Sequence, residues 1–345
     1  MIAPVRVEPA RVMRAMVGLR PFRPDGFVVR AEHRRDKDIV HHYGHGGCGI
    51  SLSWGTARMV VDLARGRGPA RAAVVGCGAV GLATARSLQE SGVAVTIHAA
   101  ALPPHTTSSM AGAFWAPFSL VDAERITPAF ARALGDASRE SHRAFSALAG
   151  DARYGVHPLP LYHLGAQPPV LTPEMSAAPE LFDGPLLAPG DHPFGERYAR
   201  RLAGMAIEPA RYLAALLEDF LRAGGVIVEH TLASPRELAA LDAPLVVDCA
   251  GLGARTLAGD ASLVPLKGQL LLLEPQPEID YMVVAPEEGL YMLPRRDAIV
   301  LGTSHQRGEW SNAPDPAETQ RILDGHRALF GAAAAEEMQP AATNA

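Results

Sequence analysis

Two glycine-rich segments near the start of the chain could each hold a ligand. The first, HHYGHGGCG (41–49), follows a short apolar run, and the second, GCGAVG (76–81), comes soon after it. A glycine-rich turn lets the backbone approach a bound group closely because no side chain stands between them. The presence of two such turns before residue 82 requires an explanation.

The second segment has the surroundings of a dinucleotide-binding loop. The apolar stretch RAAVV (71–75) precedes it, and a helical pattern and the strand-like VAVTIHA (93–99) follow. In this order Gly76 makes the tight turn, Gly78 lets the backbone approach a pyrophosphate, and Gly81 allows close packing of helix on strand. The phosphates would lie at the helix N-terminus, where N–H groups and the dipole favour anions. The alternative is a turn that binds nothing.

One expected part of this unit is missing. A carboxylate that hydrogen-bonds the ribose usually follows the second strand. Here residues 98–104 read HAAALPP. We therefore expect another group to bind the ribose, or weaker binding.

Apolar periodicity predicts further elements. Residues 207–225 predict a surface helix followed by the strand VIVEH, and residues 243–255 predict a buried strand that ends in a turn of small residues, where a backbone can approach a ligand. Two apolar arms around PRRD (294–297) predict a hairpin, and residues 315–331 predict the last helix. The proline-rich residues 157–193 predict surface loops.

Composition limits the class of protein. The 345 residues allow about two domains. A net charge of −5 and scattered basic residues disfavour a nucleic-acid partner. The three cysteines are an odd number without metal-ligand spacing, so neither a disulfide framework nor a zinc site is indicated, and we expect a reducing, cytoplasmic location. We expect no signal peptide and no membrane span.

Taken together, these segments resemble the D-amino acid oxidases, flavin enzymes of the glutathione-reductase-like class. The resemblance is carried by AAVVGCGAVGLATA, HTTSSMAGAFWAPF, VVDCAGLGAR, PLKGQ, LYMLP and VLGTSHQRGEW, and more specifically by VGLRPFRP (17–24) and HHYGHGGCGISLSWG (41–55). It implies an α/β fold with an FAD-binding Rossmann-like domain and a β-sheet-rich substrate domain.

The order of the segments departs from the family. There the GLRP and YGHGG segments come last, whereas here they come first. The chain therefore looks circularly permuted, with residues 66–72 joining a helix to the first dinucleotide strand. The expected domains are a permuted segment shared by both (1–66), an FAD-binding domain (67–150 and 207–260), a substrate domain (151–206 and 261–331) and a tail (332–345).

The resemblance implies that the two glycine-rich segments are two halves of one FAD site. A helix expected to begin at Gly49 would direct N–H groups of Gly49 and Ile50 at the reduced flavin ring and stabilise its negative charge. The implied cofactor residues are Gly46, Gly47, Cys48, Gly49, Ile50, Ser51, Gly76, Gly78, Val80, Gly81, Thr106, Thr107, Ser108, Gly112, Ala113 and Phe114.

The resemblance also implies how a substrate is held. Arg20 corresponds to the family's carboxylate clamp, Tyr291 to a tyrosine that donates to the same carboxylate, and the Gly47 carbonyl to the acceptor for the amine. The implied reaction oxidises a D-amino acid to a 2-oxo acid and ammonia, with molecular oxygen as electron acceptor. The sequence leaves a homodimer open.

The implied lid before Tyr291 is shorter than in many family members, and this indicates an open entrance. The small Ala116 and the apolar Phe114 and Leu293 are expected in the pocket. These features favour a neutral or bulky substrate side chain over an acidic one.

Other interpretations remain at several residues. Arg20 could be an ion-pair partner and Tyr291 a core residue, and Cys48 fits a small packing residue better than a nucleophile. The histidines at 41, 42 and 45 could suggest a metal, but no carboxylate or cysteine completes a ligand set, so no metal is expected.

The function also has alternatives. The reduced flavin could pass electrons to a quinone or another carrier, as in a dehydrogenase, or the substrate could be a related secondary amine. The chain could instead be a non-catalytic flavin-binding scaffold. A nicotinamide-dependent reductase would leave the first glycine segment and GLRP without a purpose.

Overall fold

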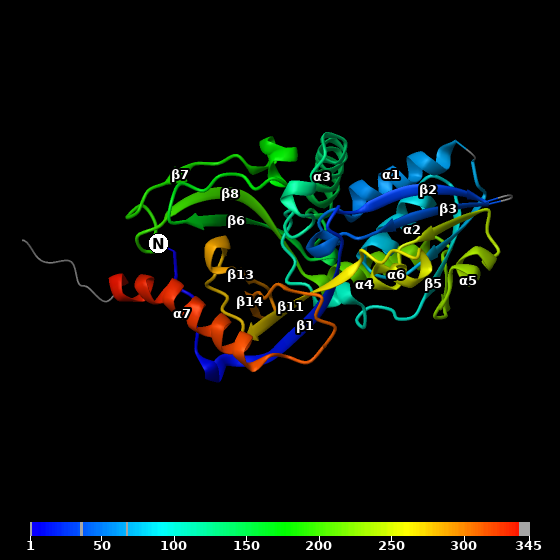
Figure 1. Cartoon of the computed structure of the whole chain (residues 1–345). Coiled ribbons are helices and arrows are strands. Elements are labelled where there is room, and N and C mark those ends of the chain that lie inside the picture. The colour runs from blue at the N-terminus through cyan, green and yellow to red at the C-terminus, as the bar shows by residue number, and fades with distance from the viewer. Residues whose placement is uncertain (1, 35–36, 67, 338–345) are drawn as a thin grey trace, which may run out of the picture.

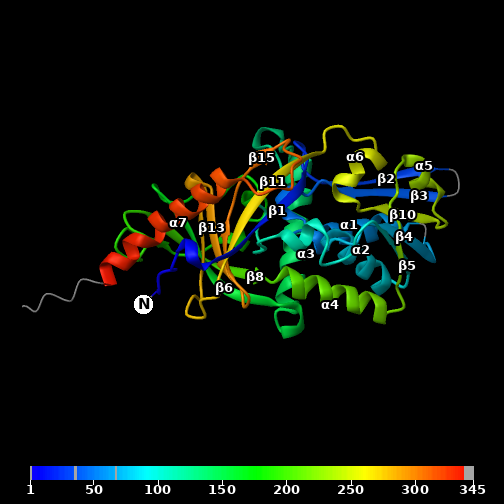
Figure 2. The same ribbon diagram turned by 90° about the horizontal axis from the view of Figure 1, so that it is seen from below.

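The computed structural model describes residues 2–34, 37–66 and 68–337 and contains two large β-sheets. Figure 1 shows one sheet on the right, with α1 (Ser53–Arg65) and α2 (Ala79–Glu90), and the other on the left, with α7 (Pro316–Glu337). Figure 2 shows α4 (Pro209–Arg222) beside the sheet that carries α1 and α2. No helix among the described residues is both long enough and apolar enough to cross a membrane.

The first sheet holds the predicted dinucleotide unit. Its strand order is β2 (Val28–Arg34), β3 (Lys37–Tyr43), β10 (Leu245–Asp248), β4 (Arg71–Val75), β5 (Ala94–Ala99) and β9 (Val226–Glu229). The strand, helix and strand predicted around GCGAVG are confirmed as β4, α2 and β5, with β4 and β5 parallel. The buried, apolar β4 and β10 suit the middle of a parallel sheet, where both faces are covered.

The second sheet is built mainly from antiparallel pairs. Its order is β1 (Val12–Phe22), β11 (Val264–Leu273), β14 (Ile299–Gly302), β13 (Leu290–Pro294), β12 (Met282–Ala285), β6 (Val156–Gly165), β8 (Tyr198–Ile207) and β7 (Leu186–Leu187), and β15 (Gln306–Arg307) pairs with β11. The predicted hairpin around PRRD is confirmed as β13 and β14. The remaining helices are α3 (Pro128–Leu148), α5 (Pro235–Ala240) and α6 (Ala254–Leu257).

The N-terminal segment contributes strands to both sheets. β1 pairs antiparallel with β11 from Val12 to Phe22, and β3 pairs parallel with β10 in the other sheet. The start of the chain also packs on the last helix, because Val5 and Val7 share a buried cluster with Leu329 of α7. The N-terminal segment therefore places β1 in one sheet and β2 and β3 in the other. The expected permutation and the domain boundaries stay predictions.

The predicted extents of the proline-rich loop region and of the helix at Gly49 were wrong. The proline-rich region is not all loop, since residues 156–165 form β6. Pro158 and Pro160 are tolerated because they lie where β6 pairs only with β8, whereas β12 reaches only residues 161–163. The helix expected at Gly49 begins at Ser53, after a 3₁₀ turn at Gly46–Cys48.

The tail was also predicted too long. The last helix, α7, continues to Glu337, so residues 332–337 of the expected tail are helical. Residues 338–345 lie outside the described part of the chain.

A variant with moved ends tests whether the tertiary contacts depend on this chain order. The variant would begin at residue 69 and end at residue 66, and a flexible glycine-serine linker would join Gly331 to Ile2. Arg327 Nε already donates to the Val7 carbonyl at 3.2 Å, so the old ends lie on neighbouring segments. We expect a folded protein whose free energy of unfolding falls by about 1–3 kcal/mol, measured by circular dichroism during urea unfolding.

The control opens the chain inside the buried strand β11, between residues 268 and 269. It should not yield a cooperatively folding protein. Equal loss of folding in both variants would contradict the prediction.

Candidate active site

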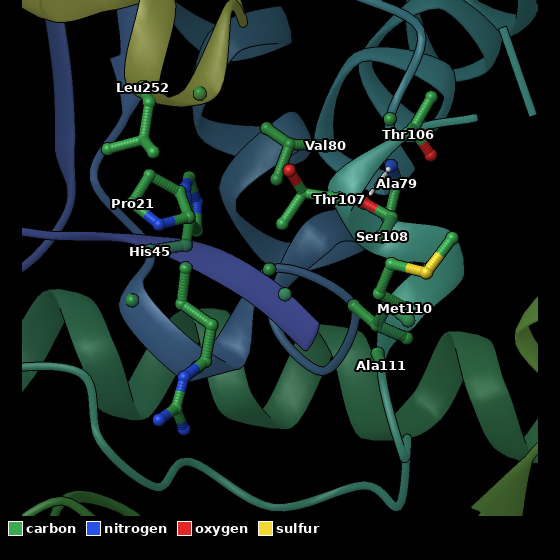
Figure 3. Close-up of a pocket in the computed structure, with 18 of the residues that line it drawn as sticks. Pro21, His45, Ala79, Val80, Thr106, Thr107, Ser108, Met110, Ala111 and Leu252 are labelled. Atoms are coloured by element: carbon green, nitrogen blue, oxygen red, sulfur yellow. Dashed lines mark hydrogen bonds between the residues drawn. The ribbon is translucent and has the colours of Figure 1, made fainter. Parts of the chain in front are cut away.

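A long cavity of about 870 Å³ is lined by residues of both sheets. Both glycine-rich segments, the 105–114 stretch and the turn after β10 contribute to its wall. Figure 3 shows Ala79, Val80 and Thr106–Ser108 on one side and Pro21, His45 and Leu252 on the other. The structure therefore brings the two glycine-rich segments to one site.

The dinucleotide loop leaves its backbone open to the cavity. Gly76 has a φ of +109°, and a Cβ there would collide with the Cys249 carbonyl. A Cβ on Gly78 would lie 3.0 Å from Ser108 Oγ, which already accepts a hydrogen bond from the Ala79 N–H at 3.0 Å (Figure 3). The N-terminus of α2 thus faces the cavity with Ser108 bonded to its first N–H, and the glycine backbone of the turn fits a pyrophosphate.

The first glycine segment lies directly against the second. A Cβ on Gly49 would lie 3.8 Å from the side chain of Val80, so the two loops are in contact. The Gly47 N–H donates to the Ser119 carbonyl at 3.0 Å, which holds this turn on the 118–120 segment. Gly46, Gly47, Gly49, Ile50 and Ser51 all line the cavity.

The 105–114 stretch crosses the cavity wall and ends on the second sheet. Ala113 adopts a φ of +64°, a conformation that costs energy in a residue with a side chain. Its carbonyl accepts from the Ile207 N–H at 2.8 Å, so the end of β8 holds it in place. Thr106, Thr107, Ser108, Gly112, Ala113 and Phe114 line the cavity.

The end of the cavity next to β5 is built from histidines and small residues. His98, Ala100, Ala101 and His105 line this part, together with His230 after β9. Burial, and secondarily His230, lower the pKa of His98. These groups stand where a ribose carboxylate was expected and not found in the sequence.

Arg20 of β1 also lines the cavity. Its Nε donates to the Leu266 carbonyl at 3.0 Å and one Nη to the Ser304 carbonyl at 2.8 Å. No described carboxylate pairs with it. Burial lowers the pKa of Arg20, but a guanidinium stays protonated at any ordinary pH. The site therefore holds a cation whose remaining N–H groups have no anionic partner in the described chain.

Tyr291 lies between two glycines close to Arg20. A Cβ on Gly112 or Gly302 would collide with its ring or hydroxyl, so the phenol fits only because both positions lack side chains. Burial raises the pKa of Tyr291 to about 12, while Arg20 and Arg295 act in the opposite direction. The hydroxyl is therefore a neutral donor, with Phe114 in edge contact at a ring separation of 5.4 Å.

The Gly47 backbone completes this group. A Cβ on Gly47 would lie 3.6 Å from Arg20 Nη1, and Gly47 is exposed to the cavity. All three predicted substrate residues therefore line one end of one cavity.

Cys48 does not line the cavity, although it was predicted among the cofactor residues. Its side chain is fully buried and its thiol donates to the Phe118 carbonyl at 2.7 Å. Burial raises the pKa of the thiol well above its usual range. Its side chain packs behind the wall. Leu293 likewise lies in the buried core and not in the pocket.

The three neighbouring histidines have different partners. His41 Nε2 contacts Glu32 at 3.1 Å, His42 Nδ1 contacts Thr84 at 3.0 Å, and His45 Nε2 contacts Thr56 at 3.0 Å. No group of three metal-ligating side chains occurs among the described residues.

Several residues of the site were missed from the sequence. His326 of α7 contacts the Tyr291 carbonyl at 3.0 Å and so positions β13. His305, whose pKa burial lowers to about 4, contacts Ser119 Oγ at 3.1 Å. Glu174 lies on the wall from a loop that showed no pattern. Only the small-residue turn after β10 gave a signal, and it does line the cavity.

Comparison with known proteins places the chain in a family. A family described as "FAD dependent oxidoreductase" (DAO) matches residues 2–63 and 71–342. The D-amino-acid oxidase of Rubrobacter xylanophilus is 36% identical over 266 residues, which are 75% of this chain and 77% of that protein. The D-amino-acid oxidase of Streptomyces coelicolor is 33% identical over 256 residues, or 72% of this chain and 74% of that one.

A solved structure shows the same fold. Glycine oxidase from Bacillus cereus aligns with a TM-score of 0.59 at 16% identity, over 77% of this chain and 79% of that chain. The predicted α/β fold class is confirmed. Because the family matches nearly all of the sequence, this protein belongs to the DAO family of FAD-dependent oxidoreductases.

Proposed function

We propose that this enzyme oxidises a D-amino acid to a 2-oxo acid, ammonia and hydrogen peroxide. The observation that carries the proposal is the unpaired guanidinium of Arg20 at the end of the cavity, beside the neutral Tyr291 hydroxyl. A cation with free N–H groups in a partly buried site favours an anionic ligand. The D-amino-acid oxidases among its relatives support a substrate with a carboxylate and an amine.

The cofactor residues are proposed from the cavity wall. The N-terminus of α2 and the backbone at Gly76 and Gly78 would hold the pyrophosphate, and Ser108 fixes the first N–H of this turn. The segment at Gly46–Ser51 and residues 112–114 would lie against the flavin ring. FAD, when bound, supplies the acceptor for a hydride and passes both electrons to molecular oxygen, giving hydrogen peroxide.

Arg20 and Tyr291 would orient the substrate. The guanidinium accommodates a carboxylate through two parallel N–H donors, and Tyr291 adds a third donor. The Gly47 carbonyl would accept from the substrate amine once that amine is neutral. Three contacts of this kind fix the direction of the Cα–H bond, which is the main requirement for hydride transfer.

The proposed reaction removes two electrons from the substrate. Cα loses a hydrogen with its electron pair, and the nitrogen lone pair forms the C=N bond. Water then adds to the imine carbon, and the C–N bond breaks to release ammonia and the 2-oxo acid. No side-chain base is needed for the hydride step.

The wall of the pocket near Tyr291 supports a bulky or long side chain whose part next to Cα is apolar. Phe114, Phe118, Val284 and Leu290 line the cavity near Tyr291, and Ala116 leaves room beside them. Arg20 is the only Lys or Arg among the described residues that line the cavity. A second carboxylate, as in an acidic amino acid, would lack a cationic partner.

Anaerobic flavin reduction tests the proposed function. The purified protein should be yellow, and D-amino acids should bleach its flavin absorbance at least about 100-fold faster than their L-enantiomers, because only one enantiomer directs Cα–H at the flavin when both other contacts are made. Admission of oxygen should restore the absorbance and release hydrogen peroxide. Reduction of the flavin by L-amino acids alone would rule out the proposal. If the flavin absorbance returned slowly with oxygen but fast with a quinone, the enzyme would be a dehydrogenase.

Substitution of Arg20 tests the carboxylate contact. Arg20→Ala should lower kcat/KM for the best D-amino acid by about 30-fold to several thousand-fold, or about 2–5 kcal/mol, because a buried carboxylate loses a charged partner. Arg20→Lys should restore only part, since one ammonium cannot make two parallel bonds. Tyr291→Phe should cost about 0.5–1.5 kcal/mol. Bound FAD should stay near the wild-type level in all three, and unchanged reduction in Arg20→Ala would contradict the assignment.

Substitution of Gly81 tests the cofactor loop. A Cβ at this position would collide with the Gly76 carbonyl, so Gly81→Ala should push α2 from β4 and distort the phosphate-binding turn. We expect FAD affinity to fall at least about tenfold, near 1.4 kcal/mol, in a fluorescence titration of the apoprotein. Gly66→Ala is the control, because nothing lies within 4 Å of its Cβ position. Equal affinity in both variants would show that Gly81 does not shape the site.

A further inference from the structure

Glu174 is the only carboxylate among the described residues that line the cavity. Its side chain makes no hydrogen bond or ion pair with a described residue, in contrast to its neighbour Glu180, which pairs with Arg139 at 2.6 Å. Arg20 shares the cavity but bonds to backbone carbonyls and not to Glu174. The cavity thus contains one cation and one anion that do not neutralise each other.

The loop that carries Glu174 is held firmly. Thr172 Oγ1 accepts from the Met175 N–H at 3.3 Å, and the Met175 side chain is fully buried. The Glu174 carbonyl accepts from the Ala177 N–H at 3.3 Å. Ala177 in turn packs on α3, where Gly135 leaves room for its carbonyl. Glu174 is therefore presented to the cavity from an ordered turn.

Aromatic rings line the cavity that contains Arg20 and Glu174. The Tyr291 and Phe114 rings lie 5.4 Å apart, and the Phe114 and Phe118 rings lie 5.7 Å apart. The Phe118 carbonyl accepts from the Cys48 thiol at 2.7 Å, which holds the 118 segment on the first glycine turn. The three rings and Glu174 therefore line the same cavity as the proposed carboxylate contact, and the rings give that cavity an apolar surface.

We propose that Glu174 binds a cationic group at the end of the substrate side chain, so that the preferred substrates are D-amino acids with a side-chain amine or guanidinium, such as D-lysine. This rests on the proposed function. The aromatic rings would cover the methylene stem, which is four carbons long in lysine, while the ammonium reaches Glu174.

The α-amine is the less suitable partner for Glu174. A carboxylate beside an ammonium favours the protonated form and raises its pKa. Oxidation at Cα needs the nitrogen lone pair free to form the C=N bond, so such a contact would oppose the reaction. The neutral Gly47 carbonyl does not have this effect.

The test compares D-lysine with D-norleucine, which has the same chain length without the charge. Anaerobic flavin reduction would give kcat/KM for both substrates in the wild type, Glu174→Gln and the control Glu180→Gln. We expect the wild type to prefer D-lysine, and Glu174→Gln to lower the D-lysine to D-norleucine ratio by about 10- to 100-fold. The control should keep the wild-type ratio. In the wild type, added salt should raise KM for D-lysine more than for D-norleucine.

The other outcomes separate this inference from the proposed function. A wild-type preference for D-norleucine, or a ratio unchanged by Glu174→Gln, would overturn the role of Glu174 while leaving D-amino acid oxidation supported. An equal fall for both substrates would place Glu174 at the α-amine and also overturn it. Failure of both substrates and of every other D-amino acid to reduce the flavin would overturn the proposed function itself. The salt dependence uses the unaltered enzyme and decides the matter if the variant does not fold.

Discussion

The antiparallel pairing of β1 with β11 is the contact on which the cavity depends. The register places Gly18 opposite Gly268, and the guanidinium of Arg20 lies over Gly268, where a Cβ would be 3.1 Å from its Nη2. The same chain then continues through β2 and β3 into the other sheet and to Gly47. One segment therefore carries both the cation and the glycine turn, and a slip of one residue in this register would turn Arg20 to the opposite face of the sheet.

Close approach of backbone is the second constraint. Gly76 and Gly81 allow α2 to lie against β4 and the turn after β10, and Gly112 and Gly302 make room for the Tyr291 ring. In each case a single methyl group would meet a neighbouring carbonyl or ring. At these positions the wall of the site therefore presents backbone in place of side chains. This composition suits a reaction that depends on holding the substrate in one orientation more than on side-chain acid–base chemistry.

The charges of the site differ from those of the surface. Many ion pairs of the described chain are exposed, such as Arg139 with Glu180, and pairs of this kind contribute little to stability. Arg20 and Glu174 have no such partners and face the cavity. Around them burial lowers the pKa of His305 to about 4 and that of His45 to about 3, so both imidazoles are neutral. Among the described residues that line the cavity, Arg20 and Glu174 are the only Arg, Lys, Asp or Glu side chains.

The sequence alone determined the local units of this protein. The period of apolar residues and the glycine spacing around Gly76 predicted β4, α2 and β5, and the apolar arms around PRRD predicted a hairpin, because these patterns depend on neighbours within one or two turns of chain. The resemblance carried by GLRP, YGHGG and LYMLP located Arg20, Gly47 and Tyr291.

Only the tertiary structure decided which side chains reach the cavity. The Cys48 side chain lies behind the cavity wall, whereas Glu174 lies on it. Pro158 and Pro160 are part of β6 because one edge of that strand has no partner at these positions. These outcomes depend on strand register and on contacts between residues far apart in the chain, which leave no periodic trace in the sequence.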